Sequence, residues 1–378
     1  MYKYSYYSGF VFFIFLLLTL TTLGLGDSNN AYAVCKKHIL IGDLHGNISG
    51  LRDYLVDAEF LNDDLSFKFP PPKETCLVFV GDYIDRDPYS LEVYQLISEL
   101  QTYINVTTSA NTNGSKVIRL IGNHEMLVLH GNSYSKMMSK RNGGNTWMYY
   151  KGDDTFDLFK LRMQTDLKND NLTSAYYFEY TDIKGEKKQV VVTHAGISED
   201  ICKEYQRNNK DNIVNPSKLV DWINSKVKID LTSKEAQEEN SIYDLSFIPN
   251  NEYFSKVGIF WNRNRFSPFC KGFDQVRGHD KQTDISYHLN GNTIYYIDIG
   301  TAKKIYNGRA YLQFEDLTDP VAKKLLARNF TLNYFKSKKL CNACFSIPQN
   351  KDKDNCRYNR SSLNISAILI KLQKFIGI

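Results

Sequence analysis

The sequence lacks several features that mark common classes of protein. No basic stripe interleaved with aromatic residues occurs among its 378 residues, and the net charge of only +5 is spread along the chain, which argues against nucleic-acid binding. There is no internal repeat. Cysteine is sparse, at seven residues, and Cys341-Asn342-Ala343-Cys344 has neither a second such pair nor a histidine nearby, so this pair favours a disulfide over a zinc or redox element.

The composition is that of a folded protein. Hydrophobic residues make up 42% and aromatic residues 13% of the chain, enough for a substantial core, which excludes an intrinsically disordered protein. The length fits one large α/β domain or two ordinary ones.

The N-terminus resembles a secretory signal. An uncharged apolar run over 10–25 follows Lys3 and leads to Ala31-Tyr32-Ala33, a small-x-small cleavage pattern. We expect residues 1–33 to be a signal peptide cleaved after Ala33, with an uncleaved membrane anchor as the alternative. The mature protein is then expected in the secretory pathway, either released or associated with a membrane.

Cysteines and glycosylation motifs are compatible with that route. The odd number of cysteines leaves at least one free or intermolecular thiol, and Cys356 is expected to pair with Cys341 or Cys344. Asn-x-Ser/Thr sequons predict a glycoprotein; they lie at Asn47, Asn105, Asn113, Asn171, Asn329, Asn359 and Asn364. We expect no glycan on Asn47, because it lies inside the first of the motifs described next.

Five apolar runs each end in polar residues of the kinds that bind metals. In order, strands expected over 38–41, 76–80, 117–121, 190–193 and 275–277 are followed by Gly42-Asp43-Leu44-His45-Gly46, Gly81-Asp82-Tyr83-Ile84-Asp85-Arg86, Gly122-Asn123-His124-Glu125, His194-Ala195-Gly196 and Gly278-His279-Asp280. Helical spacing of apolar residues separates the first three runs, which indicates a layered α/β fold with a largely parallel sheet. Further strands are expected over 293–299 and 310–314. A site at the carboxyl ends of the strands follows from this pattern.

The candidate ligands share one chemistry. All are nitrogen or oxygen donors and none is cysteine, which suits Mn, Fe or Zn in a reactive site; they are Asp43, His45, Asp82, Asn123, His194 and His279. Two cations about 3.5–4 Å apart need a bridging ligand, and Asp82, in a central motif, is the natural choice. His38, His130 and His288 match no motif and are interpreted as structural or surface residues.

The order of these motifs resembles the phosphoprotein phosphatase superfamily of dinuclear metallophosphoesterases. Three features are most similar to its Shewanella-like branch: Thr193-His194-Ala195-Gly196, Asn142-Gly143-Gly144 and the segment 258–263. The resemblance covers about residues 38–315. It implies a calcineurin-like β-sandwich flanked by helices, with a dinuclear metal site at the strand ends.

The resemblance also implies a role for each candidate residue. Asp43 and His45 would hold one cation, Asp82 would bridge, and Asn123, His194 and His279 would hold the second cation, with Mn expected and Fe or Zn as alternatives. A hydroxide between the cations would attack phosphorus in line.

The remaining roles concern protons and phosphate. His124 would protonate the leaving oxygen, with Asp85 orienting its ring. Arg86 and Arg263 would clamp the phosphoryl oxygens, with Arg265 and Arg277 as substitutes for Arg263. The family has glycine after the Asp-Arg pair where this chain has Asp87, which bears on turnover and specificity.

The expected organisation is a catalytic domain over 36–318 and a cysteine-containing extension over 319–378. Within the domain we expect a helical cap over 130–188 and a surface helical insert over 198–256. The resemblance predicts a metallophosphatase acting on phosphoprotein, at phosphoserine and phosphothreonine or at phosphotyrosine. The alternatives are hydrolysis of nucleotides or dinucleoside polyphosphates, and a phosphate-binding protein on a phosphatase fold with impaired catalysis.

Overall fold

The computed structural model describes ten stretches of the chain. They are residues 35–87, 89–111, 114–130, 153–210, 212–232, 258–262, 268–282, 284–289, 292–299 and 309–325. The expected signal peptide, Asn142 to Gly144, Arg263, Arg265 and the cysteines of the C-terminal extension lie outside them. Within these stretches, no helix has both the length and the apolarity that a membrane crossing requires.

The first sheet carries the first three motifs. Its order is β10-β9-β1-β2-β3, with β1 (Lys37–Ile41), β2 (Thr75–Phe79) and β3 (Lys116–Arg119) parallel to one another. β9 (Ala310–Glu315) runs antiparallel to β1, and β10 (Val321–Lys324) pairs with β9 at the edge. The carboxyl ends of β1, β2 and β3 therefore meet at one edge, as the sequence predicts.

The second sheet carries the other two motifs. Its order is β4-β5-β6-β8-β7, formed by β4 (Ala175–Thr181), β5 (Lys187–Thr193), β6 (Asp274–Arg277), β7 (Ser286–Leu289) and β8 (Thr293–Tyr296). β5, β6 and β8 are parallel, whereas β4 and β7 are antiparallel to their neighbours. His194 and His279 follow two adjacent parallel strands.

The two sheets pack face to face. One hydrophobic cluster draws on both, including Leu40 and Val78 from the first sheet and Phe178 and Val192 from the second. Phe314 of β9 contacts Phe178 edge-on, with ring centroids 5.2 Å apart. Because strand residues alternate in direction, the neighbours of these residues face outward toward helices.

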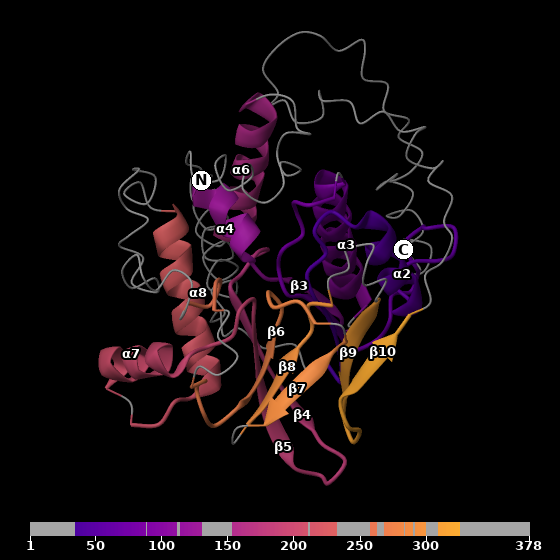
Figure 1. Ribbon diagram of the computed structural model, residues 1–378. Coiled ribbons are helices and arrows are strands. Elements are labelled where there is room, and N and C mark those ends of the chain that lie inside the picture. Colours follow the sequence, from indigo (N-terminus) through magenta and orange to yellow (C-terminus); the bar gives the residue numbers. More distant parts are fainter. Residues whose placement is uncertain are drawn as a thin grey trace, which may run out of the picture.

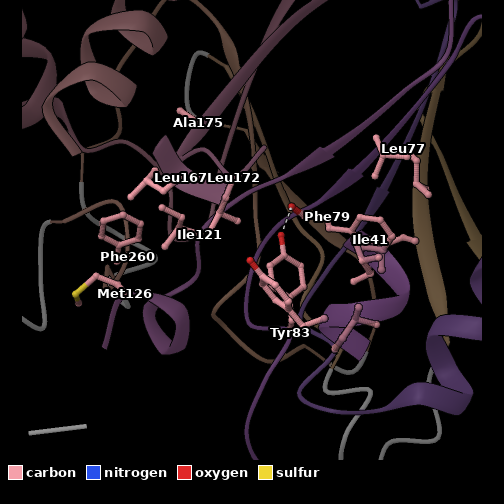
Figure 2. Packing of buried hydrophobic residues seen from close by; sticks show 14 of the residues in the cluster. Ile41, Leu77, Phe79, Tyr83, Ile121, Met126, Leu167, Leu172, Ala175 and Phe260 are labelled. Carbon is pink, nitrogen blue, oxygen red and sulfur yellow. Dashed lines mark hydrogen bonds between the residues drawn. The ribbon is translucent and has the colours of Figure 1, made fainter. Parts of the chain in front are cut away.

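Helices cover the outer faces and complete the layered α/β sandwich that the sequence predicts (Figure 1). They are α2 (Ile48–Asp57), α3 (Ser90–Asn111), α4 (Asn123–His130), α6 (Asp153–Lys168), α7 (Glu199–Asn209) and α8 (Pro216–Thr232). α3 packs on β3 and α8 on β4. Figure 2 shows part of this layer, where the Tyr83 hydroxyl lies 3.4 Å from the Phe79 carbonyl oxygen. The same hydroxyl donates to the Leu120 carbonyl at 2.6 Å and so ties the end of β2 to the end of β3.

Three segments differ from the sequence-based prediction. The region 130–188, expected as a helical cap, contains α6 but also β4 and the start of β5. β4 is buried on both faces, since Phe178 faces the other sheet and Tyr177 faces the helices, so its sequence shows no simple alternation.

The other two differences are at the insert and the C-terminal boundary. The insert over 198–256 contains α7 and α8, but α8 buries Leu219 and Ile223 against the domain and is not a surface excursion. The expected boundary at 318 falls before β10, which continues the first sheet. β10 is held mainly by its backbone hydrogen bonds to β9, because most of its side chains are exposed. The hydrophobic pattern of the sequence therefore did not indicate this strand.

Candidate metal centre

The structure brings all six predicted ligands together at the carboxyl ends of strands from both sheets. Asp43 and His45 follow β1, Asp82 follows β2, Asn123 opens α4 after β3, His194 follows β5 and His279 follows β6. All six are buried, with at most 4% of their surface exposed. No long polar loop is needed to gather them, because the parallel strands end at a common edge.

Asp82 stands between two groups of histidines. Its Oδ2 atom lies 3.4 Å from Nε2 of His45 and 3.8 Å from Nε2 of His124, while its Oδ1 atom lies 3.5 Å from Nε2 of His194. Donor atoms of His45, Asp82 and His124 lie within 4.8 Å of one another, and so do those of Asp82, His194 and His279. Asp82 is the member common to both groups, as a bridging carboxylate must be.

The hydrogen bonds of His45 fix which of its ring nitrogens is available. Nδ1 lies 2.9 Å from the carbonyl oxygen of Ile84, so Nδ1 carries the proton and donates it. Burial, followed by Arg86, lowers the pKa of His45 well below its usual value, so the ring is neutral. Its unprotonated Nε2 therefore points a lone pair at Asp82 and, at 3.8 Å, Asp43, with no hydrogen-bond partner.

His194 repeats this arrangement on the other side. Nδ1 lies 2.9 Å from the Val80 carbonyl oxygen and donates to it, and burial lowers the pKa of the ring. Nε2 then faces Oδ1 of Asn123 at 2.9 Å, and Oδ1 lies 3.0 Å from Nδ1 of His279. A lone pair facing a carbonyl oxygen is favourable only with a cation between them, so these residues fit a metal.

Negative charge is concentrated at Asp43. Burial, Asp298 and Asp82, in that order, raise its pKa well above the usual value. Its carboxylate accepts from the backbone N–H of His279 at 3.1 Å, which joins the two sheets. A divalent cation would relieve the repulsion among these buried carboxylates.

The turns that present these residues adopt left-handed backbone conformations. Positive φ values occur at His45 (45°), Asp82 (53°), Asp85 (73°), Arg86 (71°) and His279 (64°), none of which is glycine. Each such residue costs about 1–3 kcal/mol, and such strain concentrates at functional sites. Among the candidate ligands it occurs at His45, Asp82 and His279, where the chain turns sharply just after β1, β2 and β6.

Glycines allow the carboxylates to approach the backbone. A Cβ atom added at Gly122 would lie 2.2 Å from Oδ1 of Asp82, and one added at Gly278 would lie 2.2 Å from Oδ1 of Asp43. Both glycines are needed for space rather than for an unusual φ angle. The glycines directly before Asn123 and His279 therefore have a steric cause.

His124 and Asp85 form a pair beside Asp82. Nδ1 of His124 and Oδ2 of Asp85 share a short hydrogen bond, which leaves Nε2 directed at the centre. Burial alone would lower the pKa of His124, but Asp82 and Asp85 outweigh it and raise the pKa. The ring is thus suited to donate a proton.

Arg86 is a cation close to the candidate ligands and acts electrostatically on Asp43, His45 and Asp82. It is half-buried, and its Nη1 atom is buried without a hydrogen-bond partner. Arg277, one of the predicted substitutes for Arg263, is fully buried and pairs with Asp280. Arg263 itself, predicted as the second clamp, and the other substitute, Arg265, lie outside the described residues.

Sequence reasoning missed two buried carboxylates. Glu125 accepts from the backbone N–H groups of Asp82 (2.7 Å), Tyr83 (2.9 Å) and Gly122 (2.9 Å), and so fastens the second motif to the third. Asp298 follows β8 and acts electrostatically on Asp43. The apolar run before Asp298 repeats the strand-then-aspartate pattern and was the available signal.

The chain forms a layered α/β sandwich in which two groups of histidine and aspartate donors share the carboxylate of Asp82. This arrangement is that of a metallophosphoesterase. The calcineurin-like phosphoesterase family profile matches residues 37–282, which include all six predicted ligands. The chain belongs to this family.

Known proteins are similar to parts of the chain. Serine/threonine-protein phosphatase 2 of Escherichia coli is 30% identical over 123 residues, 32% of this chain and 42% of that protein. Serine/threonine-protein phosphatase PP1-1 of Saccharomyces cerevisiae is 26% identical over 128 residues, 33% of this chain and 35% of that protein. The chain spans well under half the length of these relatives.

A solved phosphatase structure also matches most of the chain. The cold-active protein-tyrosine phosphatase of a psychrophilic Shewanella species shares 18% identity over 77% of this chain and 80% of that chain, with a TM-score of 0.47.

Proposed function

We propose that the protein is a metal-dependent phosphoprotein phosphatase that hydrolyses phosphomonoesters of serine, threonine or tyrosine. The observation that carries the proposal is Asp82, whose two oxygens face His45 and His194 on opposite sides. Family membership supplies phosphoester chemistry. The names of the bacterial and yeast relatives support a phosphoprotein as the substrate.

Two divalent cations are proposed as cofactors, with manganese preferred and iron or zinc as alternatives. Asp43 and His45 would hold one, Asn123, His194 and His279 the other, and Asp82 both. When bound, they supply positive charge to the phosphoryl oxygens and a hydroxide nucleophile near neutral pH. The hydrogen bonds from Nδ1 of His45 to Ile84 and from Nδ1 of His194 to Val80 keep both rings protonated on Nδ1, so that Nε2 is free to bind a cation.

His124 supplies the proton that the leaving oxygen needs. Asp85 holds Nδ1, so only Nε2 faces the substrate, and the raised pKa keeps the ring protonated closer to neutral pH. The alcohol or phenol then leaves in neutral form. Asp85 stabilises the charged ring and fixes its plane.

Arg86 binds the phosphate. Its buried Nη1 has no hydrogen-bond partner, and the planar fork of a guanidinium matches two phosphoryl oxygens. Arg263 is proposed as a second clamp; it follows directly on Asn262, which lies fully buried against Arg277.

Hydrolysis of an aryl phosphate tests the proposal. Metal-stripped protein should be inactive, added manganese should restore turnover, and Asp82→Asn should remain inactive in manganese. Comparison of a phosphotyrosine peptide, a phosphothreonine peptide and a dinucleoside polyphosphate separates the enzymatic alternatives. A wild-type protein that binds manganese yet is as inert as Asp82→Asn would instead be a phosphate-binding protein.

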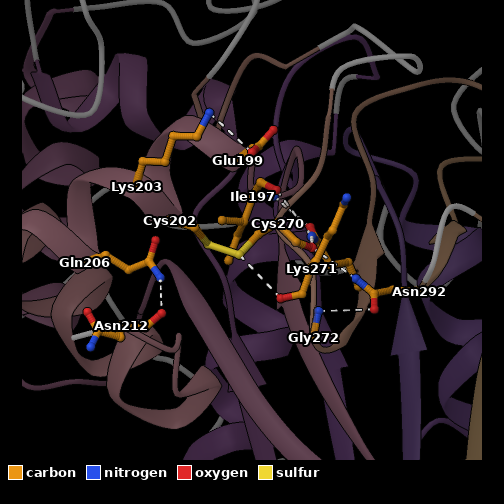
Figure 3. Close-up of a disulfide and its surroundings, with 11 residues drawn as sticks. Ile197, Glu199, Cys202, Lys203, Gln206, Asn212, Cys270, Lys271, Gly272 and Asn292 are labelled. Carbon is orange, nitrogen blue, oxygen red and sulfur yellow. Dashed lines mark hydrogen bonds and ion pairs between the residues drawn. A yellow bond between two sulfur atoms is a disulfide. The ribbon is translucent and has the colours of Figure 1, made fainter.

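We also propose that the mature protein folds in the secretory pathway. Two disulfides support this, Cys35–Cys76 and Cys202–Cys270, because such bonds persist in oxidising compartments. Figure 3 shows the second, which joins α7 to the segment before β6. N-terminal sequencing of protein from the native host should begin at Val34. Treatment with a glycosidase should lower the mass of the protein, and Asn47 should carry no glycan. Reduced cysteines and an intact N-terminus would contradict this.

A further inference from the structure

Arg277 is a buried charge next to a predicted ligand. It ends β6, two residues before His279, and none of its surface is exposed. A guanidinium stays protonated in proteins, and a buried charge persists only where its partners are well placed. Its partners therefore indicate what it does.

The guanidinium connects two segments that border the centre. Nη2 donates to Oδ2 of Asp280 at 2.7 Å and also to the backbone carbonyl of Asn262. Asp280 follows directly on His279, so the ion pair closes the turn in which His279 adopts its positive φ. The guanidinium lies over the rings of Phe269 (5.5 Å) and Tyr296 (5.3 Å), which help to hold it in place.

The loop that carries His194 rests on the same side chain. A Cβ atom added at Gly196 would lie 3.3 Å from Cδ of Arg277 and 3.0 Å from the ring of Phe269. One residue earlier, the N–H of Ala195 donates to the carbonyl of Ile259 at 2.6 Å, in the segment that ends at Asn262. Arg277 thus contacts the loop after β5, the turn after β6 and the segment 258–262.

We propose that Arg277 is a positioning residue that holds the His194 loop and the His279 turn at the spacing that the second cation requires. The inference rests on the proposed roles of His194 and His279 as ligands. Asp280 acts with it, because it neutralises the guanidinium and fixes its orientation. Lysine retains the charge but cannot reach both Asp280 and Asn262 with one planar group.

Manganese binding to metal-stripped protein tests this by calorimetry. Wild-type protein should bind two ions. In Arg277→Lys and Asp280→Asn the dissociation constant of one ion should rise about tenfold while that of the other stays unchanged, as for other partners of metal ligands. The manganese concentration for half-maximal hydrolysis should rise in parallel, with kcat at saturating manganese within about threefold of wild type.

Arg119 and Asp166 provide a matched control. They form a second ion pair, at 3.0 Å, between the buried Arg119 of β3 and the partly exposed Asp166 of α6. Arg119 also lies over Tyr94, as Arg277 lies over its aromatic neighbours. Arg119→Lys and Asp166→Asn should lower thermal stability yet leave both manganese affinities unchanged. Equal losses of affinity in these controls would overturn the proposal, as would unchanged affinities in the Arg277 and Asp280 variants.

His279→Ala separates this inference from the ligand assignment. If it loses one ion while Arg277→Lys binds both ions normally, only the positioning role fails. If His279→Ala retains both affinities, the assignment and the inference fail together.

Discussion

Nε2 of His194 lies 2.9 Å from Oδ1 of Asn123, and both atoms are acceptors, since Nδ1 of His194 donates to Val80. Such a contact is repulsive without a cation, so metal binding should stabilise the fold. Manganese at 100 times its dissociation constant should add about 2.7 kcal/mol per ion to the free energy of unfolding. Thermal denaturation of stripped and reloaded protein measures this. Asp82→Asn should gain much less, and a melting temperature indifferent to manganese would count against the site.

The fall in kcat caused by replacing His124 should depend on the leaving group of the substrate. His124→Gln removes the proton donor, so kcat should fall about 10²–10³-fold for phenyl phosphate. The fall should be much smaller for 4-nitrophenyl phosphate, whose phenolate leaves without a proton. Asp85→Asn should show the same trend, more weakly. Equal losses on both substrates would assign His124 a structural role.

Gly278→Ala should disrupt the centre without unfolding the chain. The added methyl would lie 2.2 Å from Oδ1 of Asp43 and displace that carboxylate. Manganese affinity should fall at least about tenfold, as measured by calorimetry. Gly185→Asn is the control, because an added Cβ there meets nothing within 4 Å and asparagine tolerates its φ of 81°. Native manganese affinity in Gly278→Ala would refute the steric argument.

His38 should make stability depend on pH. It is buried between the sheets, stacked on Phe178 at 3.9 Å, and burial lowers its pKa to about 3. The unfolded chain takes up this proton below about pH 6.5 but the folded protein only near pH 3. Stability is therefore lost as the pH falls between these values, by about 2 kcal/mol at pH 5.

Urea denaturation at pH 7 and pH 5 measures this loss, with His38→Gln as the comparison. The variant is less stable at both pH values but should lose about 2 kcal/mol less between them than wild type does. An identical pH dependence in the two proteins would show that His38 titrates normally.

Asp87→Asn should improve phosphate binding. The family glycine at this place is replaced by a carboxylate next to Arg86, and a negative charge there repels an anionic substrate. Its backbone N–H donates to the His45 carbonyl at 3.0 Å, a bond that asparagine retains. The inhibition constant of inorganic phosphate should fall about threefold to tenfold at low salt, and less at high salt. A rise would mean that Asp87 holds Arg86 in its binding position.

The sequence predicted most reliably the buried strands that end in candidate metal ligands. An apolar run followed by candidate ligands marked β1, β2, β3, β5 and β6, because a buried strand leaves few residue choices. A glycine precedes the first candidate ligand after four of these strands, whereas Thr193 precedes His194 after β5. The six predicted ligands lie together as that pattern predicts, and the layered sandwich is confirmed.

Other features had no local signal. The strand β4 is aromatic on both faces, and β10 is exposed and polar, so neither shows the alternation of a half-buried strand. The pairing of Cys35 with Cys76 joins residues 41 positions apart, and that of Cys202 with Cys270 joins residues 68 apart. Such pairings follow from the tertiary fold, which spacing alone does not encode. Glu125 was visible in its motif, but its three backbone partners were not.

The two ends of the segment between β5 and β6 are joined to each other. Ser198 bridges to Phe269, the N–H of Cys270 donates to Ile197, and Cys202 is bonded to Cys270. Between these ends, α8 packs on β4 and β5, and the Ile259 carbonyl accepts from the N–H of Ala195 beside His194. Variation in this segment is therefore coupled to the geometry of the centre, and evolution cannot exchange it without consequence for His194.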